Sequence, residues 1–420
     1  MPRGLGRAFA FVAIVLTCSA HGQELVISDV SVVDVERGAL VEHRDVYIDG
    51  QRIVEVADAR AAHDVRVIDG SGLFLIPGLW NFHAHLTMEE GEGYAERSLD
   101  DFVPNGVLTA VDMGGELERL NAWRDEILAG ARTGPAILVA GPFIDGEKDL
   151  DGPETLNAWR RRSMRVIDSA AQVGTLVSEL SPQVDLLKAH SRLPPEAFFA
   201  LAAEASMRGK PLAAHLPVGV SPLEAVRAGV DTIEHSISFL GDAMYEDDPE
   251  VMQAGVSATV ERLRSAEGER LFAAAASSGT CVTPTLLATV RIAREQAMPF
   301  FMQVADDLEW ITLRLHENGV RLLAGSDAAG ERYGRSQAED LLLELEHLAS
   351  IGIPASDVLR SATINPALCL RREGEGSVAP GAAADLVLLE GNPLVDIGNV
   401  RRIRGVIVKG RPVDASRTGQ

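Results

Sequence analysis

The sequence is poor in cysteine, in basic residues and in long apolar runs, and each shortage excludes a class of protein. Of its three cysteines, only Cys281 and Cys369 lie beyond the N-terminal segment, and two distant cysteines do not make a disulfide framework. The 39 lysines and arginines stand against 61 acidic residues, a formal net charge of -22 that disfavours nucleic acid and anionic lipid as partners. The apolar run at 8–17 is too short to span a bilayer, so no stable transmembrane segment is expected.

The length and the overall composition fit one large domain with a small companion. Apolar residues make up 46% and charged residues 24%, the profile of an ordinary soluble globular protein. A chain of 420 residues is too long for a single small domain and about right for a large barrel with a satellite. The sequence shows no internal repeat and no low-complexity tract. Its oligomeric state, including a homo-oligomer, is left open.

The first 22 residues have the pattern of an export signal. Arg3 and Arg7 precede the apolar run Ala8–Thr17, and the small and polar residues that follow suit cleavage before Gln23. We therefore expect an exported protein, periplasmic or secreted. Cys18 offers the weaker alternative of a lipoprotein anchor. Export does not by itself imply a disulfide-stapled fold, given the cysteine count.

Both ends of the mature chain read as short strands separated by turns. Residues 24–77 combine apolar alternation with the turn signals Asp49-Gly50 and Asp69-Gly70, and residues 385–413 have the same texture. Neither piece alone can bury much apolar surface, so we expect the two to form one small β-sandwich. The predicted organisation is a signal peptide at 1–22, a composite β-sandwich from 23–77 and 370–420, and a barrel at 78–369.

The middle of the chain alternates between apolar, β-branched segments and helix-like stretches. Eight such strand candidates over roughly 250 residues predict an α/β fold of the (β/α)8 TIM barrel type. The rival is a doubly wound open sheet, which usually has fewer strands and a glycine-rich phosphate turn that is absent here. The candidate strands are 78–86, 106–114, 136–143, 184–190, 211–217, 230–236, 280–286 and 320–327.

Residues with metal or proton chemistry fall at the ends of these candidate strands. They are His83 and His85, Lys188, His215, His235 and Asp327. In a (β/α)8 barrel the carboxyl ends of the strands meet at one mouth, where active sites lie. Side chains two apart on a strand share a face, so two imidazoles in a His-x-His pair can reach one cation. The pair alone is weak evidence because it also arises by chance, and the other four residues strengthen it.

These pieces resemble the amidohydrolase superfamily, in its imidazolonepropionase-like and prolidase-like branch, from about residue 25 to residue 413. The matching motifs are Pro77-Gly78-Leu79-Trp80-Asn81-Phe82-His83-Ala84-His85-Leu86, Asp185-Leu186-Leu187-Lys188, Ala213-Ala214-His215, Ile233-Glu234-His235-Ser236, Leu323-Ala324-Gly325-Ser326-Asp327-Ala328 and Ala362-Thr363-Ile364-Asn365-Pro366-Ala367.

The resemblance implies a site with two divalent metal ions. His83, His85 and Asp327 would hold the first ion, and His215 and His235 the second. Lys188 would bridge the two as a carbamate, in keeping with the low pKa of a lysine buried beside cations. Imidazole and oxygen ligands favour zinc, with manganese, cobalt and iron as alternatives.

The reaction implied is cleavage of a C–N bond in an amide, dipeptide-like or cyclic, by a metal-bridging hydroxide. Asp327 would act as general base and then as general acid. A helix N-cap is the alternative role for Asp327.

Substrate contacts are less legible. His190 takes the position at which members of this branch often carry a tyrosine that meets a substrate carboxylate, so His190 is the candidate substrate-binding residue, with inert packing as its alternative. Thr283 and Thr285 are candidates for hydroxyl hydrogen bonds. Arg332 and Arg335 are candidates for a carboxylate contact, although solvated loop arginines are commoner.

Two features argue against further binding sites, one on the helix near Leu342 and one in the acidic segments. Many relatives carry a histidine near Leu342, and none is present here. The acidic segments Glu246–Asp248 and Asp145–Asp151 lack the calcium-loop ligand pattern, so we expect exposed loops.

Three other functions stay open at this stage. A lactone or ester hydrolase would use the same metals, and no residue excludes it. A mononuclear deaminase on the same fold is disfavoured because such relatives lack the bridging lysine. A non-catalytic exported binding protein is disfavoured because all six ligand positions carry competent residues.

Overall fold

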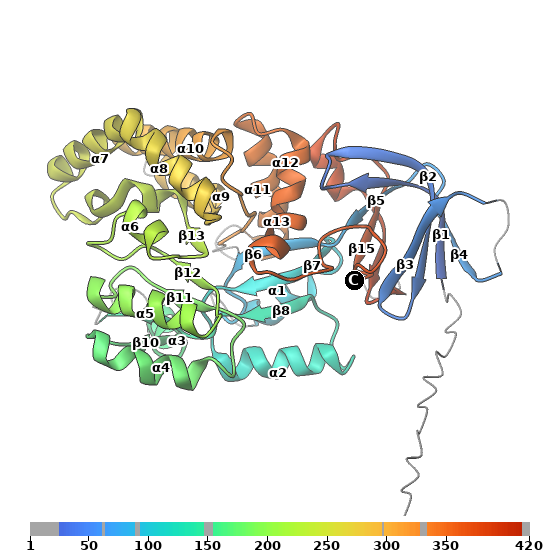
Figure 1. Ribbon diagram of the computed structural model, residues 1–420, viewed down its shortest axis with the longest axis horizontal. Helices are drawn as coiled ribbons and strands as arrows, with labels where there is room; N and C mark the ends of the chain where they lie inside the picture. The colour runs from blue at the N-terminus through green and yellow to red at the C-terminus, as the bar shows by residue number, and fades with distance from the viewer. Residues whose placement is uncertain are drawn as a thin grey trace, which may run out of the picture.

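The structure is a computed structural model that describes residues 25–60, 64–88, 93–146, 154–295, 298–327 and 334–413. The export signal and Cys18 lie outside the described residues. The chain has a mixed α/β fold, with a large sheet at one end and short parallel strands surrounded by helices at the other (Figure 1).

The large sheet unites strands from both ends of the chain. Its order is β17-β16-β15-β5-β1-β2-β3, and β4 pairs with β1. The junction between the two ends is β5 with β15, an antiparallel pair in which Leu75 lies opposite Leu388. The strands are β1 (Leu25–Asp34), β2 (Ala39–Asp49), β3 (Arg52–Asp58), β4 (Arg66–Asp69), β5 (Phe74–Pro77), β15 (Leu386–Leu389), β16 (Ile403–Val408) and β17 (Arg411–Pro412).

Apolar alternation explains why these segments form strands. Successive side chains of a strand point to opposite faces, and Leu25 with Ile27 and Val46 with Ile48 are buried in one cluster. Gly50, at φ 55, makes the predicted tight turn between β2 and β3. The sharing of one sheet by the two chain ends agrees with the expectation; the two-layer sandwich and the exact domain boundaries stay predictions.

The remaining strands are short and parallel. They form the sheets β6-β7-β8 and β10-β9-β11-β12-β13-β14. Asp185 N donates to Val139 O at 2.7 Å and so links the segment before β11 to β8. The strands are β6 (Leu79–Ala84), β7 (Val107–Asp112), β8 (Ala136–Val139), β9 (Phe143–Asp145), β10 (Met164–Val166), β11 (Leu187–Ala189), β12 (Leu212–Ala214), β13 (Thr232–Glu234) and β14 (Cys281–Thr283).

Seven of the eight predicted segments contain one of these strands, and the eighth, 320–327, lies between β14 and β6 without a named strand of its own. Leu323 N donates to Val282 O, and Phe82 N donates to Ala324 O, both at 2.8 Å. The segment therefore connects the two parallel sheets. The short strands β9 and β10 were not predicted.

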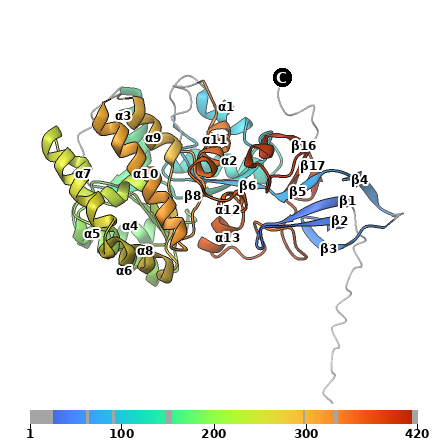
Figure 2. The ribbon, with the colours of Figure 1, turned by 90° about the horizontal axis from the view of Figure 1, so that it is seen from above.

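Helices cover the outer side of the parallel strands (Figures 1 and 2). They are α1 (Tyr94–Asp100), α2 (Leu117–Leu128), α3 (Glu154–Ser163), α4 (Val173–Leu180), α5 (Pro195–Met207), α6 (Pro222–Arg227), α7 (Pro249–Leu263), α8 (Ala266–Ser278), α9 (Leu286–Glu295), α10 (Pro299–Glu317), α11 (Gln337–Ser350), α12 (Ala355–Ser361) and α13 (Ile364–Cys369), with the 3-10 segments η1 (Ala170–Gln172), η2 (Ser236–Tyr245) and η4 (Ile397–Arg401).

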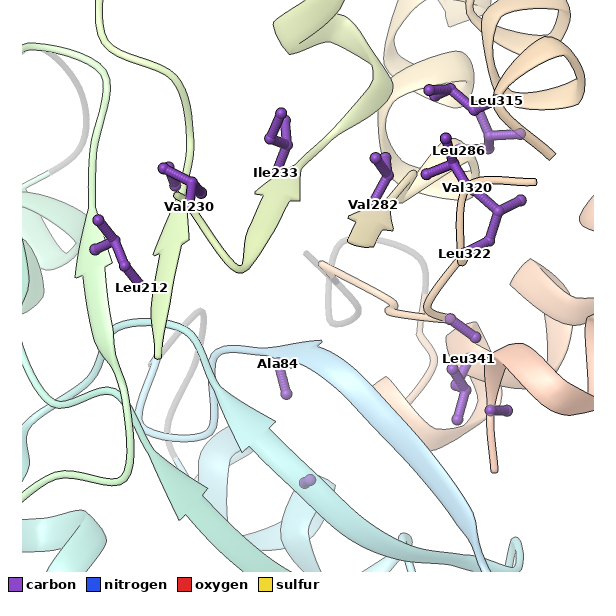
Figure 3. Close-up of a cluster of buried hydrophobic side chains, with 14 of the residues drawn as sticks. Ala84, Leu212, Val230, Ile233, Val282, Leu286, Leu315, Val320, Leu322 and Leu341 are labelled. Atoms are coloured by element: carbon purple, nitrogen blue, oxygen red, sulfur yellow. The ribbon is translucent and has the colours of Figure 1, made fainter. Parts of the chain in front are cut away.

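Two apolar layers hold this part together. Leu212, Ile233 and Val282, on three neighbouring strands, belong to the large cluster between strands and helices, as does Leu341 of α11 (Figure 3). Alternate strand residues such as Phe82 belong to a second, smaller cluster. The smaller cluster forms an apolar floor beneath the carboxyl ends of the strands. The residues at those ends, such as His83 and His85, lie above this floor.

The two cysteines within the described residues form a disulfide. Cys281 begins β14 and Cys369 ends α13; their Cα atoms are 6.5 Å apart, although 88 residues separate them in sequence. The cysteine count did not imply this bond, which forms because the fold brings the end of α13 against the floor of the parallel strands. Both side chains belong to the smaller cluster. Within the described segments we find no helix of the length and apolarity that crossing a membrane requires.

Candidate metal centre

The six predicted ligand residues follow or end parallel strands. They are His83 in β6, His85 directly after β6, Lys188 in β11, His215 after β12, His235 after β13 and Asp327 after the segment 321–324. Asp327 N donates to His83 O at 2.8 Å, which fixes the eighth segment beside β6 at this level. Because the carboxyl ends of parallel strands meet at one edge, the fold gathers these residues in one place.

The Asp327 carboxylate lies among three imidazoles. Its Oδ1 is 3.3 Å from Nε2 of His85 and 3.5 Å from Nε2 of His83, and its Oδ2 is 3.5 Å from Nδ1 of His235. One ligand atom from each of His83, His85 and Asp327 fits within a span of 4.8 Å. This arrangement of two imidazoles and a carboxylate can hold a divalent cation.

Hydrogen bonds set the protonation of His83 and His85. Nδ1 of His83 lies 2.7 Å from a carboxylate oxygen of Glu234, and Nδ1 of His85 lies 3.1 Å from the carbonyl oxygen of Gly114. A carbonyl and a carboxylate oxygen only accept, so both Nδ1 atoms carry the proton. The Nε2 atom of each ring therefore faces Asp327 and is the nitrogen that a bound metal would use.

His235 and His215 are held by hydroxyl groups. Nδ1 of His235 is 2.8 Å from Oγ1 of Thr285, while Nε2 of His215 is 2.7 Å from the Tyr245 hydroxyl. For His215 the remaining nitrogen is Nδ1, in contrast to His83 and His85. Thr285, a candidate substrate contact, thus hydrogen-bonds a predicted ligand, His235, in this structure.

Lys188 is the one buried side chain of this group without a hydrogen-bond partner among the described residues. Its side chain is 2% exposed, and its Nζ atom has no hydrogen bond. Burial lowers the pKa of Lys188, against the raising effect of Glu234 and Asp327. A buried polar atom without a partner needs an explanation, and a bound group or ion beside Lys188 Nζ is one.

Burial and charge prepare the other groups for metal binding. Burial lowers the pKa of His235 to about 3 and that of His215 well below its usual value, so both imidazoles are neutral. Burial alone would raise the pKa of Asp327, but His83, His235 and His85 lower it well below the usual range. The neutral imidazoles of His235 and His215 and the ionised carboxylate of Asp327 are the protonation states that a cation requires.

The backbone is strained at the site. His235, Thr285 and Asp327 have φ values of 65, 47 and 42, in the left-handed region that non-glycine residues seldom adopt. Gly325 allows the close approach beside them: a Cβ atom there would lie 2.6 Å from Cβ of His83. Such strain persists only where the surrounding structure enforces it, as at functional sites.

His190 lies beside the centre and is bound by a buried acid. Its Nδ1 is 2.8 Å from Oδ2 of Asp145, and the other oxygen of Asp145 accepts from Arg192 N at 2.7 Å. We expected an exposed loop at 145–151; for Asp145 this is wrong, because β9 carries it inside beside His190. Arg335 pairs with Asp340 on α11, and Arg332 lies outside the described residues.

Thr283 and the acidic segment 246–248 lie in different environments. The hydroxyl of Thr283 is buried and has no hydrogen-bond partner among the described residues. The segment 246–248 is exposed as expected, and Asp248 caps α7.

Aromatic rings surround the centre in a closed circle. Neighbouring ring centroids are 4.7–6.1 Å apart in the order His83, His235, His215, His190, Phe143, Trp159, His85 and back to His83. Sequence reasoning missed Glu234, Asp145, Tyr245 and Trp159 as neighbours of the site. Only Glu234 had a usable signal, as a charged residue inside the apolar strand before His235.

The amidohydrolase family model matches residues 74–413. The chain belongs to the amidohydrolase family. The family predicted from the motifs is thereby confirmed, and with it the class of enzyme, a hydrolase of carbon–nitrogen bonds. The role of each site residue as a metal ligand stays a prediction.

The relatives differ in their named activities. An adenine deaminase from Klebsiella pneumoniae is 24% identical over 87% of this chain, which spans only about half, 53%, of that relative's length. Among solved structures, a prolidase complexed with N-methylphosphonate-L-proline has TM-score 0.71 and 24% identity, with 93% of this chain and 99% of that chain covered. A Xaa-Pro dipeptidase has TM-score 0.73 and 20% identity, covering 93% and 100%. These likenesses show the fold.

Proposed function

We propose that this enzyme hydrolyses an amide C–N bond in a small dipeptide-like or cyclic substrate with two metal ions. The observation that carries the proposal is the buried amine of Lys188, without a hydrogen bond, within a group that also contains four histidines and Asp327. The prolidase and dipeptidase among the similar structures support the dipeptide-like class.

The residues fit two ions. His83, His85 and Asp327 would hold the first through Nε2 atoms and a carboxylate, and His215 and His235 would hold the second. The neutral amine of Lys188 would add to carbon dioxide and lose a proton, giving a carbamate that would supply oxygen ligands to the ions. The lowered pKa of Lys188 supports this step because only the neutral amine adds to carbon dioxide.

Two side chains of the protein would take part in the reaction directly: Asp327 would transfer the proton, and His190 would bind the substrate. Two bound divalent ions would supply an activated water and polarise the scissile carbonyl. Asp327, ionised at neutral pH and 3.3 Å from His85, would accept the proton of the attacking water. It would then give that proton to the leaving nitrogen, which departs as a neutral amine. His190, oriented by Asp145, would bind the substrate beside His215.

We also propose that the parallel strands close into the eight-stranded barrel expected from the sequence. The hydrogen bonds of Asp185 to Val139 and of residues 321–327 to both β14 and β6 support closure. Export of the protein is a further proposal. The Cys281–Cys369 disulfide supports it, since such bonds persist in oxidising compartments.

Metal analysis tests the proposed function. Purified enzyme dialysed against buffered Zn²⁺ should contain about two ions per chain by mass spectrometry and should hydrolyse members of a dipeptide and N-acyl amino acid panel. One bound ion together with deaminase activity would favour the mononuclear deaminase. Turnover of lactones alone would favour the lactone or ester hydrolase. No bound ion would overturn the proposal.

The Lys188→Ala variant tests most directly whether Lys188 supplies ligand atoms to the metal ions. It should bind at most one ion tightly and lose turnover by about 100-fold or more, as expected when a metal ligand is removed. Short carboxylic acids such as propionate should restore part of the activity by supplying the missing oxygens. Lys210→Ala is the matched control, because Lys210 bonds the backbone carbonyl of Val184, away from the centre.

A further inference from the structure

A single strap joins two of the predicted ligands of the second metal. The strap, residues 236–245 (η2), begins directly after His235 and ends at Tyr245, whose hydroxyl contacts His215. Asp242 Oδ1 also accepts from Gly219 N at 2.8 Å, in the loop that follows His215. Two contacts therefore attach the far half of the strap to the His215 loop.

The near half of the strap is anchored under His235. Ser236 Oγ lies 2.6 Å from Oγ1 of Thr312 on α10, and Ser238 Oγ donates to the carbonyl oxygen of Glu234 at 2.7 Å. The two halves meet at Gly241, where φ is 63 and ψ is -150. This conformation is essentially restricted to glycine. It redirects the strap so that Tyr245 reaches His215.

The contact matters because of the chemistry of the imidazole. A metal binds the ring nitrogen that lacks a proton, and the other nitrogen must then donate its N–H to a partner. Nε2 of His215 is 2.7 Å from the Tyr245 oxygen, so Nδ1 is the nitrogen left for the metal. A phenol oxygen can accept the Nε2 proton, and Ser191 also hydrogen-bonds this oxygen.

We propose that Tyr245 is a positioning residue that holds His215 in the Nε2-protonated form, with Nδ1 directed to the second metal. The inference rests on the proposed two-metal function and adds a residue that the family's ligand motifs do not contain. The ring of His190, 5.0 Å from that of His215, packs beside the same imidazole. Tyr245 and His190 together limit the rotation of His215.

A purely structural role for Tyr245 fits the structure less well. The residue is 37% exposed, so its ring contributes little to the core, and its hydroxyl contacts a predicted ligand. Removing only the oxygen should therefore leave the fold intact and change metal binding at one site.

Metal titration separates these roles. Tyr245→Phe and the control Tyr47→Phe, in the distant sheet, would be stripped of metal and titrated with Zn²⁺ against a chromogenic chelator. We expect one of the two stepwise dissociation constants of Tyr245→Phe to rise about 10- to 100-fold, with the other nearly unchanged. Unchanged constants, or an equal loss at both sites, would overturn the inference.

The tautomer of His215 gives a readout independent of metal. In metal-free protein labelled with ¹⁵N-histidine, long-range proton–nitrogen spectra should show the proton of His215 on Nε2, and Tyr245→Phe should shift it toward a mixture. An Nδ1-protonated ring in the unsubstituted protein would contradict the inference. This experiment decides the role of Tyr245 even if the unsubstituted protein binds fewer than two ions, a result that would overturn the proposed function instead.

Gly241→Ala tests the strap itself. A Cβ atom at Gly241 would meet no atom within 4 Å, so this variant changes only the backbone preference. It should displace Tyr245 and reproduce the selective loss of one metal. Two ions bound as tightly as in the unsubstituted protein would show that the kink does not position Tyr245.

Discussion

At the scale of single residues, the candidate site contains groups that hold the predicted metal ligands in place. Glu234 is fully buried and accepts from His83 and from Oγ1 of Thr232. Burial would raise the pKa of Glu234, but Lys188 and His83 lower it to about 2, which favours the charged carboxylate. That charge fixes His83 as an Nδ1 donor.

Glu234→Ala should weaken the metal site of His83 by about 10- to 100-fold, because the imidazole loses the partner that sets its tautomer. Glu234→Gln keeps an acceptor oxygen and should lose less. Chelator competition measures both variants. Equal affinity in Glu234→Ala and the unsubstituted enzyme would contradict this role.

For Asp327, the proposed role in proton transfer can be tested separately from its proposed role in metal binding. Asp327→Asn preserves the shape of the side chain and one oxygen but cannot accept the proton of the attacking water. We expect turnover to fall by about 100- to 10,000-fold, while at least the His215 and His235 metal is retained. Full turnover with both metals bound would exclude Asp327 as the base.

At the scale of elements, a buried carboxylate joins two helices below the site. Glu344 of α11 accepts from the backbone N–H groups of Leu286 and Leu287 at the start of α9. Burial raises its pKa from 4.5 to about 7, although these two hydrogen bonds oppose the shift. The position of α9, and of Thr285 immediately before it, is thus tied to α11.

This raised pKa predicts a dependence of stability on pH. Between pH 4.5 and about 7 the folded chain keeps a proton on Glu344 that the unfolded chain has lost, so the free energy of unfolding falls as pH rises through this window. The effect approaches about 1.4 kcal/mol per pH unit. Urea unfolding at pH 5 and pH 7 should show a shallower dependence for Glu344→Gln, and parallel dependences would contradict the assignment.

At the scale of the whole molecule, a disulfide bond links strand β14 to helix α13 beneath the candidate metal centre. The Cys281–Cys369 disulfide closes a loop of 88 residues that contains α9, α10 and α11. Replacing both cysteines by alanine should lower the free energy of unfolding by about 2–5 kcal/mol, because the unfolded chain gains freedom. Denaturant unfolding of the oxidised enzyme measures this. Free thiols in the native oxidised protein, or unchanged stability, would show that the bond is absent.

The family, the enzyme class and most of the parallel strands could be predicted from the sequence alone, as could the positions of the candidate ligands at the strand ends. Period-two apolar segments ending in His83, Lys188 or His235 are local patterns, and local patterns are visible along the chain. The sequence misplaced Asp145, which looks like part of an acidic loop, and gave no sign of the Cys281–Cys369 bond, because both depend on segments that meet only after folding.

How the predicted ligands are held became clear only from the folded structure. That Glu234 bonds His83, that Asp145 bonds His190 and that Tyr245 reaches His215 follows from the convergence of strand ends and from the kink at Gly241. The physical reason is that hydrogen bonds between side chains distant in sequence require defined positions in space, which no spacing along the chain encodes.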